Sequence, residues 1–196
     1  MIRPMTMSRV MDAMYRGRRD EAEALAADTG ELDVFEAAAL DRAEEVGRLL
    51  ADDPGRAAAW TSDGFTALHF AAFFGGGGTV ARALLAAGAA VDARSRNVMS
   101  VTPLHSAAAG GHDDVAGELL TAGADPNARQ RGGFAPLHAA AENGDEAMVG
   151  RLLAAGADPV VTTDDGRTPA DLARAAGHEA IARRLERRPH TDDRPG

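Results

Sequence analysis

The stretch that decides the fold reads Thr102-Pro103-Leu104-His105-Ser106-Ala107-Ala108-Ala109-Gly110-Gly111-His112, because most of the chain repeats it. Thr-Ala-Leu-His begins at Thr66, Ala-Pro-Leu-His at Ala135 and Thr-Pro-Ala-Asp at Thr168. A fixed period of 20 to 50 residues indicates one supersecondary unit that is stacked on copies of itself. We therefore expect a single elongated domain whose core is shared between neighbouring units.

Each copy carries its own start and stop signals. The Thr102 hydroxyl can cap a helix start, and Pro103 suits the first helical position because its missing N–H would be unpaired there. Gly110 or Gly111 then ends this helix, since glycine adopts the left-handed conformation without steric cost. A second helix follows, with the apolar stripe Val115, Leu119 and Leu120, and it ends at Gly123.

This unit resembles the ankyrin repeat, with its T-P-L-H-x-A signature and its period of about 33 residues. The resemblance covers residues 33–186 well and the first 30 residues weakly. It implies an all-α solenoid of helix-turn-helix units, joined by β-hairpin loops and closed by degenerate capping repeats.

The repeats set the expected domain organisation. We expect a flexible leader at residues 1–7, a single repeat domain at 8–188 and a disordered tail at 189–196. The parts of the domain are a degenerate N-terminal helix pair (8–32), a divergent repeat (33–63), a repeat with insertions (64–99), two regular repeats (100–132 and 133–165) and a C-terminal capping repeat (166–188). Charged outer sides at both ends agree with solenoid caps, which have no neighbour to cover them.

Composition narrows the range of partners. The formal net charge is −9 and the sequence pI is about 5.1, which argues against nucleic acid or an anionic membrane as the partner. There is no cysteine, so the chain offers neither a disulfide framework nor thiolate chemistry. No apolar run reaches the length of a membrane span or a secretory signal, and we expect a cytoplasmic protein. The absence of lysine and the abundance of alanine are typical of proteins from GC-rich bacterial genomes.

The copy that starts at Thr66 departs most from the pattern. Its glycine run at residues 75–78 is one residue longer than the other turns, and its loop at residues 94–101 is two residues longer, so the step to Thr102 is 36 residues instead of 33. A glycine run before a helix can bind a phosphate on backbone N–H groups. However, no lysine follows the run, and the alignment already requires a helix stop there, so we favour a plain loop.

The histidines do not predict a metal site or a catalytic site. His69, His105 and His138 occupy one equivalent position, and stacked repeats place such residues about 10 Å apart, too far for shared ligation. The resemblance instead implies that each hydrogen-bonds backbone and the neighbouring threonine. No H-E-x-x-H, G-x-S-x-G or Ser/His/Asp arrangement is present. We therefore expect no enzyme, no metal and no cofactor.

The resemblance also implies that a partner is bound on the concave face, by the hairpin tips and by the last residues of the first helices. The candidate partner-binding residues are Phe65, Phe73, Phe74, Arg96, Val98, Met99, Val101, Arg131, Phe134, Glu142, Asn143 and Arg167. Four of the six phenylalanines of the chain fall in this set, and exposed aromatic and arginine side chains are typical of interface cores. The alternative is that these rings pack on neighbouring hairpins and alanine-rich helices.

The sequence thus predicts a non-catalytic module that binds a protein partner, and a monomer without nucleic-acid or membrane partners. Two alternatives stay open. The phenylalanine-lined groove would suit a small-molecule binder or an enzyme that uses His105, Glu142 or Tyr15 as acid or base. Exposed Val98, Met99 and Phe74 would instead permit a self-associating structural protein.

Overall fold

The computed structural model describes residues 8–187, so the expected leader (1–7), tail (189–196) and residue 188 lie outside the described residues. The α-helices of the described part are α1 (Arg9–Tyr15), α2 (Arg19–Thr29), α3 (Val34–Ala39), α4 (Ala43–Asp52), α5 (Ala67–Phe74), α6 (Thr79–Ala86), α7 (Pro103–Gly110), α8 (Asp113–Thr121), α9 (Pro136–Glu142), α10 (Glu146–Ala154), α11 (Pro169–Ala175) and α12 (Glu179–Glu186). Two short 3-10 helices are η1 (Pro54–Ala58) and η2 (Arg131–Gly133). Between residues 8 and 187 the hairpin loops form no regular strand, and one antiparallel bridge joins Trp60 to Thr66.

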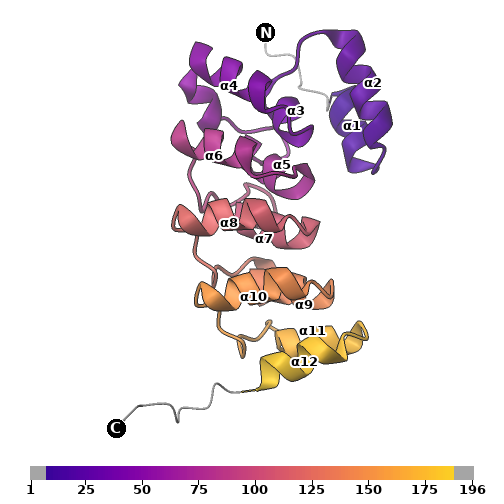
Figure 1. Ribbon diagram of the computed structural model, residues 1–196, viewed down its shortest axis with the longest axis vertical. Coiled ribbons are helices and arrows are strands. Elements are labelled where there is room, and N and C mark those ends of the chain that lie inside the picture. The colour runs from indigo at the N-terminus through magenta and orange to yellow at the C-terminus, as the bar shows by residue number, and fades with distance from the viewer. Residues whose placement is uncertain (1–7, 188–196) are drawn as a thin grey trace.

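From α3 onward the helices form two stacked rows (Figure 1). The inner row is α3, α5, α7, α9 and α11, and the outer row is α4, α6, α8, α10 and α12. The core lies between the rows, where one leucine of each helix from α5 to α10, such as Leu104 and Leu119, is fully buried. Small alanines on the inner row let successive repeats approach closely. The predicted all-α solenoid is confirmed.

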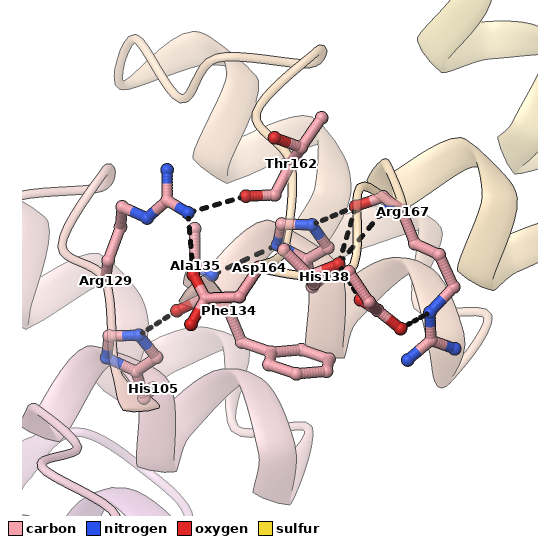
Figure 2. A network of polar contacts seen from close by, with 10 residues as sticks. His105, Arg129, Phe134, Ala135, His138, Thr162, Asp164 and Arg167 are labelled. Carbon is pink, nitrogen blue, oxygen red and sulfur yellow. Dashed lines mark hydrogen bonds and ion pairs between the residues drawn. The ribbon is translucent and has the colours of Figure 1, made fainter. Parts of the chain in front are cut away.

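A histidine in each regular repeat links that repeat to the next one. The Nδ1 atom of His105 accepts hydrogen bonds from the Thr102 N–H (3.2 Å) and hydroxyl (2.8 Å). Its Nε2–H donates to the carbonyl of Phe134 in the following hairpin at 3.1 Å. Figure 2 shows the same arrangement at His138, whose ring joins the Ala135 N–H to the next hairpin. The structural role predicted for these histidines is confirmed for His69 and His105, whereas His138 has Ala135 in place of the threonine and bonds backbone alone.

The last repeat has an aspartate in place of the histidine. Asp171 Oδ2 accepts hydrogen bonds from the Thr168 N–H at 2.9 Å and hydroxyl at 2.7 Å. The helix start is thus stabilised as in the other repeats. However, a carboxylate has no N–H to donate onward, so Asp171 does not form the second bond that His138 makes.

Two segments that depart from the repeat pattern form turns in the structure. Asp41 stands where other copies have glycine and adopts a positive φ of 58°, which aspartate tolerates better than most residues. Gly75 ends α5, as the helix-stop interpretation predicted, and the N–H of Gly77 donates to the Asp41 carboxylate at 3.4 Å. The glycine run is therefore part of the packing between turns.

The helices α1 and α2 do not continue the column. Figure 1 shows the pair beside α3 instead of beyond the first repeat, where an end cap was expected. Tyr15, at the end of α1, contacts Phe70 and Phe74 of α5. The Arg19 guanidinium of α2 donates to the carbonyls of Leu40 and Phe74, each at 3.0 Å. The arginine thereby satisfies carbonyls that helix ends leave open, which fixes the pair at this place. None of the described helices is long and apolar enough to cross a membrane.

Candidate functional site

A groove of about 610 Å³ opens between the hairpins and the inner helices α5, α7 and α9. We call it the aromatic groove and define it by its apolar lining, which is Tyr15, Phe65, Phe70, Phe73, Phe74, Met99, Val101 and Phe134. The irregular repeat supplies most of these residues, because α5 carries three phenylalanines where the other inner helices carry small or polar residues. Its volume lies in the range of pockets that bind ligands or anchoring side chains.

The rings of α5 form one packed cluster. Phe73 and Phe74 pack edge to face with centroids 4.8 Å apart, and Phe70 stacks on Phe74 at 6.5 Å. Phe70 is buried and Phe74 half-buried, whereas Phe73 is 41% exposed. Phe70 and Phe74 therefore belong to the floor of the groove, and Phe73 presents its ring to solvent. The exposure of Phe73 agrees with the expected surface role, whereas the packing of Phe74 agrees with the alternative role.

Tyr15 closes one end of the groove. Its ring meets Phe74 edge to face with centroids 5.6 Å apart, and its hydroxyl donates to the Asp63 carboxylate at 2.9 Å. Burial of the ring, followed by the bond to Asp63, raises the pKa of the Tyr15 hydroxyl. Tyr15 is therefore neutral and held in place, so α1 limits the groove on the side of α3.

Two histidines line the floor, but both nitrogens of each ring are used. Burial lowers the pKa of His69 and of His105 to about 4, against the partial effect of backbone hydrogen bonds. The imidazoles are neutral, with Nδ1 accepting from the helix start and Nε2 donating to the next hairpin. Neither ring has a nitrogen free to exchange a proton with a ligand. Within residues 8–187, no group of His, Asp or Glu side chains is arranged to hold a metal ion.

Four polar side chains on the groove have no hydrogen bond or ion pair with another described residue. They are Ser106, Gln130, Arg131 and Glu142. Ser106 is only 8% exposed, and it lines the groove from α7. Arg131 lies on the hairpin side, whereas Glu142 lies at the far end of α9. These groups are available to a bound molecule.

Eight of the twelve predicted partner-binding residues line the groove, namely Phe65, Phe73, Phe74, Met99, Val101, Arg131, Phe134 and Glu142. Four do not. The Arg96 guanidinium lies 4.0 Å above the Trp60 ring, and Val98 is 71% exposed outside the groove. Asn143 donates to the carbonyl of Ala109 at 3.2 Å and so ties two repeats together.

The fourth residue outside the groove, Arg167, has its backbone and side chain engaged by neighbours. Its carbonyl accepts from His138 at 3.2 Å, and its Nε donates to Asp165 at 2.9 Å (Figure 2).

Phe70 and Ser106 line the groove without having been predicted as site residues, and one signal was available for them. They precede Phe73 and Ala109 by three positions, and residues three apart share one face of a helix. The prediction used only the last residues of the inner helices. Helical periodicity would have extended it by one turn.

Comparison with known families gives one result. A family model described as ankyrin repeats, in three copies, matches residues 24–130 and 104–192, which together cover most of the chain. No curated protein matches the chain.

Proposed function

The chain belongs to the ankyrin-repeat family, whose repeats generally mediate protein–protein interaction, and we propose that it is a non-catalytic module that binds a protein partner through the aromatic groove. One observation carries the proposal. Phe73 and Met99 remain 41% and 49% exposed above an apolar cavity, although the chain contains few aromatic residues. Large apolar side chains gathered at one exposed place are typical of interfaces.

The groove also has the composition of an interface. Its centre is aromatic and aliphatic, and its charged groups, Arg131 and Glu142, lie at its edges. Protein interfaces share this arrangement of an apolar centre with a polar rim. A partner side chain placed against Phe73 and Phe134 would be removed from water on several sides.

The enzymatic alternative receives less support from the geometry. His105 uses both ring nitrogens, and the Tyr15 hydroxyl is bonded to Asp63. Of the three acid or base candidates, only the carboxylate of Glu142 has no hydrogen-bond partner among the described residues. A single carboxylate without a second proton-transfer group on the groove favours binding over acid–base catalysis.

The test is an affinity capture from the source cell with three proteins: wild type, Phe73→Ala and Val160→Ala. Phe73 is chosen over Phe74 because Phe74 packs against three other rings. Val160 is a matched control, since it is 66% exposed and lies outside the groove. We expect Phe73→Ala to weaken capture by about 2 kcal/mol or more and Val160→Ala to leave it unchanged.

Equal retention of the partner by wild type and Phe73→Ala would exclude the groove as the binding site. Light scattering of the same proteins tests the self-association alternative, because a dimer formed through Met99 or Val98 would have twice the mass of the monomer.

A further inference from the structure

We propose that the segment bound in the aromatic groove is an amphipathic α-helix of the partner, with acidic residues on the flank facing Arg131 and basic residues on the flank facing Glu142. The proposal rests on the proposed function of the groove and adds the shape and charge of the bound segment. Three observations carry it: the width of the groove floor, the use of the hairpin backbone, and the positions of the two unpaired charges.

The width of the floor fits one helix. The inner helices α5, α7 and α9 lie across the groove, and they are 8, 8 and 7 residues long. At 1.5 Å per residue the floor is about 10–12 Å wide, which equals the diameter of an α-helix with its side chains. An extended segment occupies only about 5 Å, the spacing between paired strands, and would leave half of the floor uncovered.

The length of the floor fixes the length of the segment. Packed helices lie about 8–10 Å apart, so the three inner helices span about 16–20 Å along the groove. A helix of this length has about 11 to 13 residues. Tyr15 closes the end of the floor toward α3, so the segment lies over α5, α7 and α9.

The hairpins along one side of the groove argue against an extended segment. Backbone N–H groups of successive hairpins are already used on one another, since Arg96 donates to Gly64 at 2.8 Å and Arg131 donates to Met99 at 3.0 Å. An extended segment buried against an apolar floor would leave its own N–H and C=O groups unpaired, and each such group costs free energy. A helix satisfies these groups internally, so it can lie on phenylalanine rings without that cost.

The charges orient the helix. Arg131 and Glu142 stand at opposite sides of the floor, because one precedes α9 on the hairpin side and the other ends α9. The seven residues of α9 separate these sides by about 10 Å, and neither side chain has an ion pair within residues 8–187. A helix lying between them presents one flank to the guanidinium and the other to the carboxylate. Opposite charges at these positions favour binding and fix which flank faces which side.

The experiment uses the full chain and a random library of 14-residue peptides displayed on ribosomes. Selection is carried out in parallel on wild type, on Arg131→Glu and on the control Arg183→Glu, whose side chain is exposed on α12 outside the groove. We expect wild type to enrich peptides with apolar residues at spacings of three and four and an acidic flank. These peptides should become helical by circular dichroism when they bind.

Charge exchange gives the sharper result. A wild-type-selected peptide should bind Arg131→Glu about tenfold more weakly, and changing its acidic flank to lysine should recover the affinity. Arg183→Glu should bind the original peptide like wild type. Selected peptides that contain proline within the apolar pattern, that stay extended when bound, or that bind wild type and Arg131→Glu equally would overturn the proposal.

The outcome separates this proposal from the function on which it rests. Peptides that stay extended but lose affinity on Phe73→Ala leave the groove as a binding site and refute only the helix. Peptides that bind without regard to Phe73→Ala refute both. If no peptide is enriched, the helix is refuted, and capture of the cellular partner decides on the groove.

Discussion

Replacing His105 by glutamine should remove a defined part of the pH dependence of folding stability. The imidazole is 4% exposed, and its Nδ1 accepts from a backbone N–H and a hydroxyl of Thr102. A proton added at Nδ1 would face these two donors in a buried place. Burial therefore lowers the pKa of His105 from the ordinary 6.5 to about 4 in the folded chain.

The sign follows from proton uptake. Between pH 6.5 and 4 the unfolded chain binds a proton at His105 and the folded chain does not, so stability is present above pH 6.5 and is lost as the pH falls. At pH 5.5 the loss is about 1 kcal/mol, and below pH 4 it reaches about 3 kcal/mol. His69 has the same pKa and the same surroundings, so it contributes a second loss of similar size.

The assay is urea unfolding of wild type and His105→Gln at pH 7.5 and pH 5.5. Carboxylates titrate in both proteins, and the comparison of the two pH-dependent changes removes their contribution. Wild type should lose about 1 kcal/mol more than the variant on going to pH 5.5. If both proteins lost the same free energy of unfolding, the neutral, doubly bonded His105 inferred from the structure would be wrong.

Three further predictions concern stability. Leu104→Ala, at a fully buried position of α7, should lower the free energy of unfolding by about 2–5 kcal/mol in urea denaturation, and a loss below 1 kcal/mol would contradict its place in the core. Arg151→Ala removes a bidentate ion pair with Asp113 (2.6 and 2.5 Å) that joins two outer helices. Because both side chains are partly exposed, we expect the free energy of unfolding to fall by at most about 1 kcal/mol, and this loss should fade toward about 0.5 M salt. Gly144→Ala should destabilise the chain by about 1–3 kcal/mol in thermal unfolding, because φ is +74° there and a Cβ would lie 2.5 Å from the His178 ring; an unchanged melting temperature would refute this.

The sequence predicted the features that depend on neighbouring residues. Helix starts at Thr102 and helix stops at Gly111 are local signals, and the structure has them where the repeat pattern placed them. The groove was predicted in outline for the same reason, since the repeat register fixes which positions, such as Phe73, end an inner helix.

The remaining features depend on contacts between residues that are far apart in the sequence. Val10, Met14 and Tyr15 give α1 an apolar face, but they do not tell which surface that face covers. Its place beside α3 follows from contacts with Phe70 and Phe74 in another repeat, which no spacing along the sequence indicates. In the same way, no residue close to Arg96 in the sequence predicts that its guanidinium lies above the Trp60 ring.

Asp171 determines how the array can be extended by engineering. A repeat with histidine at this position holds an N–H donor that needs the carbonyl of a following hairpin, as His138 needs that of Arg167. Cutting such an array between two repeats removes the acceptor of this donor, whereas a repeat with Asp171 is complete by itself. A designer who grafts another unit after α12 should therefore restore histidine at position 171. One who shortens the array should move the aspartate to the new last unit.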